Sequence, residues 1–154
     1  YFWNYLSKEQ IHLVSSYPKY SRVCCFKGIN RESFSLNTKA EPSCFENQFD
    51  YFERLFRLGI DIYGYVTLTA KCDTNFERAI AVFLDKLQSI HELLPLRIVP
   101  LQVFKFTPLS GRMSPETEDL FLGQYIAIEF WKSELERRFN SEMREIPITD
   151  VKLT

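Results

Sequence analysis

Three units along this chain each pair a β-rich segment with an amphipathic helix. They start at Tyr20, Ile60 and Arg97, so the repeat interval changes little. Parallel strands need a connection of about a dozen or more residues, usually a helix packed back on the sheet, and regular strand and helix alternation is typical of that arrangement. Three units are too few to close a barrel. The repeat therefore predicts an α/β fold: a partial (β/α) TIM-like barrel, an open arc of parallel strands with helices on its convex face.

Length and composition favour a single domain. The 154 residues, 45% of them hydrophobic, are enough for one core, which we place in residues 1–139, with 140–154 as a tail or short extra strand. The 19 basic and 20 acidic residues offer no basic surface for nucleic acid. Apolar stretches are far shorter than the roughly 20 residues that cross a bilayer. We expect a cytoplasmic protein; its start at Tyr1 leaves open that it is a piece of a longer one.

Turn residues and capping patterns divide the chain into elements. The expected order is a helix in 1–16, a strand from Tyr20 to Gly28, a polar loop from Ile29 to Glu41, a helix from Pro42 to Gly59, a strand from Ile60 to Ala70, a helix from Thr74 that Pro95 closes, a strand from Arg97 to Thr107, and a long helix from Ser114 to Phe139. Pro100 removes one ladder donor, which indicates a bulge or an edge position for the third strand.

The second strand alternates so cleanly that its two faces can be assigned. Its even-numbered side chains are apolar or small, as a surface buried under helices requires: Ile62, Gly64, Val66, Leu68 and Ala70. Its odd-numbered side chains are polar or amphipathic, and they include Tyr63, Tyr65, Thr67 and Thr69. The odd set should therefore line the concave face of the arc.

Candidate binding residues follow the carboxyl ends of the strands, where open α/β sheets bind ligands. Lys27 ends the first strand and Asn30 follows it in the loop. Thr67 and Thr69 end the second strand, and Lys105 lies at the end of the third. A cation and hydroxyl or amide groups at one rim would bind a carboxylate or phosphate. The alternatives stay open: Lys27 and Lys105 as solvated side chains, and the threonines as residues chosen for strand propensity.

Other catalytic and metal motifs are absent from the sequence. The chain has neither a supported Ser, His and Asp set nor a glycine-rich phosphate loop. Its four cysteines, Cys24, Cys25, Cys44 and Cys72, lack the short spacings of zinc or cluster sites. We interpret them as small buried hydrophobes in a reduced compartment; the alternative is that Cys25, Cys44 and Cys72 meet as a redox or metal group. No catalytic residue and no metal ligand is assigned.

A longer pattern carries a family resemblance. The segment RVCCFKGINRESFSLNTKAEPSCFENQFDYFERLFRLGIDIYGYVTLT, followed by LLPLRIVPLQVFKFTP, resembles the later half of a radical S-adenosylmethionine domain. The shared features are a strand ending in Lys-Gly, a loop running from Asn to Thr and Ala, and a helix before a Gly-capped strand. They cover roughly residues 20 to 107. In that family a partial barrel holds a [4Fe-4S] cluster and S-adenosylmethionine, which is cleaved reductively to a radical.

The resemblance also has a clear departure. The family ligates its cluster through CxxxCxxC and binds the methionine amino group with a Gly-Gly-Glu-like segment, and this chain has neither. The resemblance implies that Lys27, Asn30, Thr67, Thr69 and Lys105 contact S-adenosylmethionine or substrate, and that the chain alone is inactive. A missing N-terminal half-barrel would then be its partner. The alternative is a non-enzymatic half-barrel that binds a small anionic ligand, or its own copy through an exposed strand edge.

Overall fold

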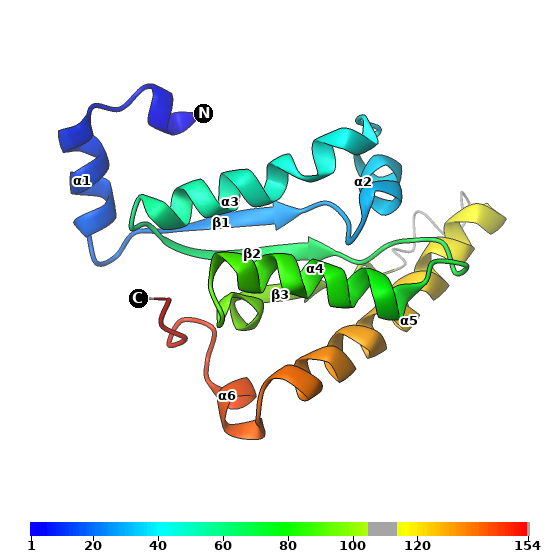
Figure 1. Ribbon diagram of the computed structural model, residues 1–154. Helices are drawn as coiled ribbons and strands as arrows, with labels where there is room; N and C mark the ends of the chain where they lie inside the picture. Colours follow the sequence, from blue (N-terminus) through cyan, green and yellow to red (C-terminus); the bar gives the residue numbers. More distant parts are fainter. Residues whose placement is uncertain (105–113, 154) are drawn as a thin grey trace.

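A computed structural model describes residues 1–104 and 114–153 (Figure 1). Its sheet has three parallel strands in chain order: β1 (Ser21–Phe26), β2 (Asp61–Thr67) and β3 (Ile98–Leu101). Ser21 pairs with Asp61 at one end of the β1–β2 ladder, and Gly64 pairs with Ile98 in the β2–β3 ladder. The predicted α/β class and an open sheet of parallel strands are therefore confirmed.

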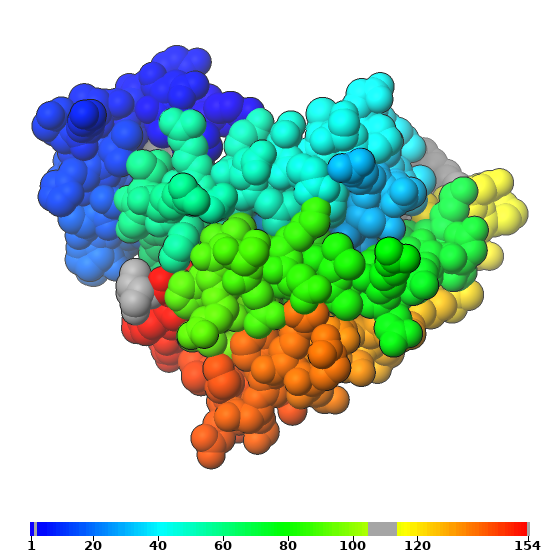
Figure 2. All heavy atoms as spheres, viewed as in Figure 1, coloured from blue at the N-terminus to red at the C-terminus, as the bar shows by residue number. Residues whose placement is uncertain are grey.

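Helices connect the strands and cover one face of the sheet. They are η1 (Phe2–Asn4), α1 (Lys8–Ser16), α2 (Arg31–Thr38), η2 (Pro42–Phe45), α3 (Asn47–Arg57), α4 (Phe76–Ile90), η3 (Leu94–Arg97), α5 (Pro115–Arg138) and α6 (Ser141–Glu145). Figure 2 shows α4 and α5 side by side on the molecular surface. Among the helices that the structure describes, none has the length and apolar character needed to cross a membrane.

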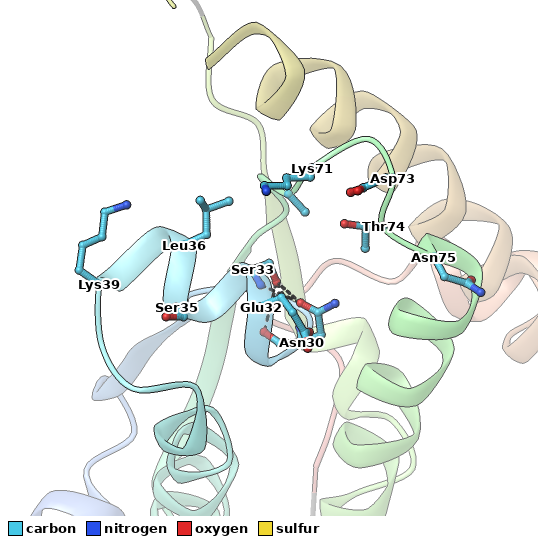
Figure 3. Close-up of a pocket in the computed structure, with 11 residues that line it drawn as sticks. Asn30, Glu32, Ser33, Ser35, Leu36, Lys39, Lys71, Asp73, Thr74 and Asn75 are labelled. Atoms are coloured by element: carbon cyan, nitrogen blue, oxygen red, sulfur yellow. Dashed lines mark hydrogen bonds between the residues drawn. The ribbon is translucent and has the colours of Figure 1, made fainter. Parts of the chain in front are cut away.

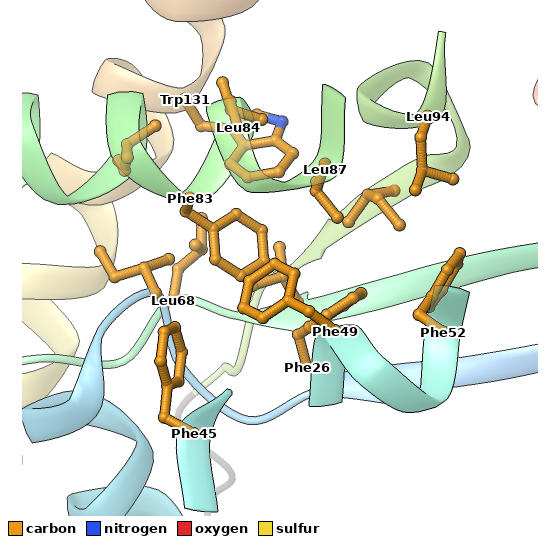
Figure 4. Close-up of a cluster of buried hydrophobic side chains, with 14 of the residues drawn as sticks. Phe26, Phe45, Phe49, Phe52, Leu68, Phe83, Leu84, Leu87, Leu94 and Trp131 are labelled. Carbon is orange, nitrogen blue, oxygen red and sulfur yellow. The ribbon is translucent and has the colours of Figure 1, made fainter. Parts of the chain in front are cut away.

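Aromatic rings fill the space between the sheet and its helices (Figure 4). The ring of Phe26 on β1 lies 5.1 Å from that of Phe49 and 5.3 Å from that of Phe83, centroid to centroid. Trp131 of α5 lies 6.0 Å from Phe83 and is 1% exposed. Because the rings of β1, α3, α4 and α5 touch in sequence, one continuous core joins these elements.

The two faces of β2 differ as the alternation predicts. Ile62 and Val66 are fully buried under the helices, whereas Tyr63, Tyr65 and Thr67 on the other face are half-exposed. The two tyrosine rings meet edge to face at 6.1 Å. Parallel sheets are usually covered on both faces. Among the described residues, this second face has no covering layer comparable to α3 and α4.

The region predicted as a polar loop, Ile29 to Glu41, instead contains α2. Asn30 caps the helix, since its side chain accepts from the Ser33 N–H at 2.8 Å while the Ser33 hydroxyl accepts from the Asn30 N–H at 3.2 Å. Lys39 ends it with φ of 62°, a left-handed conformation in which glycine is more usual. The polar composition of α2 gives it little hydrophobic periodicity, and its C-cap is Lys39 rather than the usual glycine. Neither signal therefore indicated a helix in this region.

Two further expectations about helix boundaries were only partly right. The predicted helix in 1–16 is divided into η1 and α1, and the one from Pro42 to Gly59 is divided into η2 and α3. Gly59 does terminate α3: it has φ of 71°, and the N–H of Ile60 reaches back to the Leu55 carbonyl at 3.4 Å. The Gly59 N–H also donates to the Phe56 carbonyl at 2.9 Å, and these two bonds form the Schellman pattern that a terminal glycine permits.

The third strand is shorter than predicted, because β3 ends at Leu101. Beyond it, the Val103 peptide is hydrogen-bonded to the side chain of Gln124 on α5 rather than to a strand. The predicted strand residues Lys105 and Thr107 lie outside the described residues.

The tail of the chain packs against the amino end of the sheet. Residues 140–153 contain α6 and no strand, which corrects the suggestion of a short extra strand. Val151 and Leu153 are buried. Arg97, with a side chain only 5% exposed, donates to the Val151 carbonyl at 2.8 Å and pairs with Asp61 at 2.8 Å. This buried arginine therefore ties the tail to the sheet.

Candidate functional site

A cleft of about 780 Å³ opens at the carboxyl ends of β1 and β2 (Figure 3). One wall is α2, which contributes Glu32 and Lys39. The other is the loop between β2 and α4, which contributes Lys71, Asp73 and Asn75. This volume is within the range of roughly 300–1,000 Å³ found for small-molecule sites. The position is also where open parallel sheets bind ligands, since loops from neighbouring strands meet there.

The sharp exit from β1 positions the α2 wall. Gly28 has φ of 149°, and a Cβ atom at this position would lie 2.5 Å from the backbone nitrogen of Phe34. Only glycine fits so close to the start of α2. The Ser33 hydroxyl also accepts from the Ile29 N–H at 3.0 Å. These contacts fix the direction in which α2 leaves the sheet.

Asn37 connects α2 to the ends of both neighbouring strands. Its Nδ2 donates to the Thr69 carbonyl at 3.1 Å and to the Lys27 carbonyl at 3.3 Å. Its Oδ1 accepts from the Thr69 hydroxyl at 2.7 Å. One amide therefore holds together the chain segments that follow β1 and β2, beneath the cleft.

The opposite wall is held by α5. Asp119 accepts from the Cys72 N–H at 3.3 Å, and a Cβ atom on Gly123 would lie only 2.0 Å from the Ala70 carbonyl oxygen. Burial, with a smaller effect of the neighbouring Asp119, raises the pKa of the Cys72 thiol. The thiol therefore stays protonated at neutral pH. The hydrogen bond to Asp119 and the close packing against Gly123 position the loop between β2 and α4.

Four charged side chains line the cleft: Glu32, Lys39, Lys71 and Asp73. Within the described part of the chain none of them has an ion-pair partner. Two positive and two negative groups around one hollow can bind a ligand that carries charges of both signs. Asn75 adds the N-terminus of α4, where unpaired N–H groups favour a negatively charged group.

Of the predicted site residues that the structure describes, Asn30 lines the cleft, whereas Lys27, Thr67 and Thr69 do not. Asn30 lines the cleft, and its Oδ1 already accepts from Ser33, which leaves its Nδ2 as the available donor. Lys27 has an exposed side chain beside the end of β1, and its N–H donates to Gln48 at 2.7 Å. Thr67 lies on the open face, and the Thr69 hydroxyl is bound to Asn37. Lys105 falls outside the described residues.

Sequence reasoning missed Asn37, Lys71 and Asp73. The last two directly follow the predicted second strand, so their position after a carboxyl end was a usable signal. Asn37 had no such signal, because its partners lie 10 and 32 residues away along the chain.

The described residues do not fit an iron–sulfur cluster. Within 1–104 and 114–153 no three His, Cys, Asp or Glu side chains are grouped to hold a metal ion. The four cysteines are free thiols, and each is partly exposed rather than buried as expected. Cys24 and Cys44 do pack against the core. The cluster that the family resemblance implies would need ligands from outside this set.

No family model, curated protein or solved structure matches this chain.

Proposed function

We propose that this chain is the C-terminal portion of a radical S-adenosylmethionine-like protein and that its cleft binds S-adenosylmethionine. The observation that carries the proposal is a set of charged side chains at the carboxyl edge of a parallel sheet that have no ion-pair partner among the described residues, namely Glu32, Lys39, Lys71 and Asp73. The amino-acid part of this cofactor has one ammonium and one carboxylate group, so it complements a cleft with charges of both signs.

Each charged group would have a separate role. Lys71 and the N-terminus of α4 both border the cleft and suit the carboxylate, because both contribute positive potential. Asp73 and Glu32 suit the ammonium group. The Nδ2 of Asn30 remains available to donate to a ribose hydroxyl. When bound with a cluster in a complete enzyme, the cofactor would supply radical chemistry; this chain would supply only binding and orientation.

The uncovered face of the sheet supports the half-barrel part of the proposal. Tyr63 and Tyr65 are half-exposed and Val23 is 48% exposed on a sheet type that is normally covered on both sides. An N-terminal half-barrel would cover this face and would bring the cluster ligands. The chain alone would then be catalytically inactive.

Calorimetric titration of the chain with S-adenosylmethionine tests the cofactor assignment. Lys71→Ala and Asp73→Asn should each weaken binding about tenfold, the scale of one charge-assisted hydrogen bond. Lys19→Ala is the matched control, because Lys19 is exposed and lies before β1, at the amino end of the sheet. Absence of binding at millimolar cofactor, or equal losses in Lys71→Ala and Lys19→Ala, would reject the assignment.

The second candidate is a non-enzymatic half-barrel that associates with its own copy. Among the described residues β1 lies at the edge of the sheet, and an unpaired edge can pair with another chain; the exposed Val23 on this strand adds apolar surface for such a contact. Sedimentation at increasing concentration should then detect a dimer that Val23→Lys weakens. A chain that stays monomeric at every concentration would exclude this candidate.

A further inference from the structure

A second groove, of about 510 Å³, lies between one side of α4 and the opposite wall formed by the start of α2 and the end of η2. It adjoins the cleft, because Asn30, Glu32 and Asn75 line both. Its floor is apolar: Phe45 and Phe83 are buried there, and Val82 is 45% exposed. Because Phe45 is 3% exposed and Phe83 is fully buried, Val82 provides the exposed apolar surface for a ligand.

Basic side chains surround this apolar floor. Arg31 and Lys86 both pair with the single carboxylate of Glu46, Arg31 at 3.5 Å. Arg78 has no ion-pair partner within the described part of the chain. With Glu32 at the junction, the groove has three positive and two negative side chains, so its net charge is positive.

Arg78 and Val82 are one turn apart on α4, and α4 places them along the same side of the groove. A guanidinium group therefore stands next to an uncovered apolar surface. A carboxylate or phosphate would bind the guanidinium in its planar, two-pronged geometry, while a short hydrocarbon chain would cover Val82.

We propose that this groove binds an anionic amphipathic small molecule, a carboxylate or phosphate ester with an apolar tail, at a site that adjoins the cofactor cleft but uses other side chains. The inference does not depend on S-adenosylmethionine binding, because it uses Arg78 and Val82, which do not line the cleft.

Three probes of equal chain length separate charge from hydrophobicity: octanoate, octanol and octylammonium. Octanoate should shift the amide resonances of α4 around Val82 in nuclear magnetic resonance titrations, and it should bind more tightly than octanol, with octylammonium weakest. Arg78→Gln should weaken octanoate about tenfold and reduce its advantage over octanol. Val82→Ser should weaken octanoate and octanol alike.

Arg57→Gln is the matched control, since Arg57 is an exposed arginine on α3 outside the groove. It should leave octanoate binding unchanged. Folding of each variant is checked by its amide spectrum. Shifts spread over the exposed N-terminal segment instead of α4, or equal affinity for octanoate and octylammonium, would overturn the proposal. Loss of S-adenosylmethionine binding with retained octanoate binding would reject only the cofactor assignment.

Discussion

The side chain of Gln124 forms two hydrogen bonds with the peptide groups of Val103. Its Oε1 accepts from the Val103 N–H at 2.8 Å, and its Nε2 donates to the Val103 carbonyl at 2.9 Å. Gln124 is fully buried whereas Val103 is 42% exposed, so these bonds are partly shielded from water. A helix side chain thus takes the place that a neighbouring strand would occupy beyond the end of β3, and it anchors α5 to the sheet.

Removing this amide should destabilise the fold strongly. Gln124→Ala leaves a donor and an acceptor of Val103 without their partner, and we expect a loss of about 2 to 4 kcal/mol in the free energy of unfolding. Urea denaturation measures it. Gln102→Ala, at an exposed position nearby, is the control and should change stability by less than about 0.5 kcal/mol. Equal midpoints for the two variants would contradict the proposed anchoring role.

Gly123→Ala should also destabilise, although alanine is the better helix former by about 1 kcal/mol. The added Cβ would lie 2.0 Å from the Ala70 carbonyl oxygen, so α5 or the loop must move. Ser133→Ala, exposed on the same helix, provides the comparison. Thermal unfolding should give a lower midpoint for Gly123→Ala than for Ser133→Ala. A higher midpoint would mean that the loop after β2 moves away from the added Cβ at little cost in free energy.

Arg97→Met should release the tail. Methionine keeps much of the buried volume but donates no hydrogen bond to Val151 or Ile62. We expect a loss of about 2 kcal/mol and faster hydrogen exchange around Val151. Arg144→Met removes a more exposed ion pair with Glu136 and should leave exchange at Val151 unchanged. If the amides around Val151 stay protected from exchange in Arg97→Met, burial of Val151 and Leu153 is enough to hold the tail against the sheet.

Glu134 should make stability depend on pH. The hydrogen bond from Arg137 is the main reason that the pKa of Glu134 lies below its ordinary 4.5, and Arg138 adds to it while burial opposes both. A lowered pKa in the folded state stabilises the protein above the unfolded value, and this contribution disappears as pH falls through the folded value. Glu134→Gln should thus lose less stability than the wild type between about pH 5 and pH 3.

Denaturation at a series of pH values measures this difference. Glu129→Gln is the control, because Glu129 is exposed and pairs only with exposed Lys132 among the described residues. It should follow the wild-type profile. Parallel profiles for wild type and Glu134→Gln would mean that Glu134 keeps the same pKa on unfolding.

The strands were predictable where packing imposes a simple period. Ile62 and Val66 alternate with Tyr63 and Tyr65, because one face of β2 is buried and the other is not. The extent of β3 was not predictable in this way. Apolar residues continue past Leu101, but the partner of Val103 is a glutamine about twenty residues later on a helix.

The candidate site was predictable in position but less so in composition. The parallel topology directs attention to the carboxyl ends, and Asn30 does line the cleft. Hydrogen bonds between distant residues decide the rest: Asn37 engages Thr69, and Gln48 engages the Lys27 backbone. Such polar pairs leave no periodic trace in a sequence, so one chain alone cannot reveal them.

The two tryptophans of the chain lie in different surroundings. Trp131 is packed against Phe83 in the core, whereas Trp3 stacks on Tyr1 at 5.0 Å and lies 4.8 Å below the guanidinium of Arg54. Their fluorescence should therefore respond to different events. With one replaced by phenylalanine, emission from the other would separate detachment of the first residues from melting of the core, and would reveal which occurs first as denaturant is added.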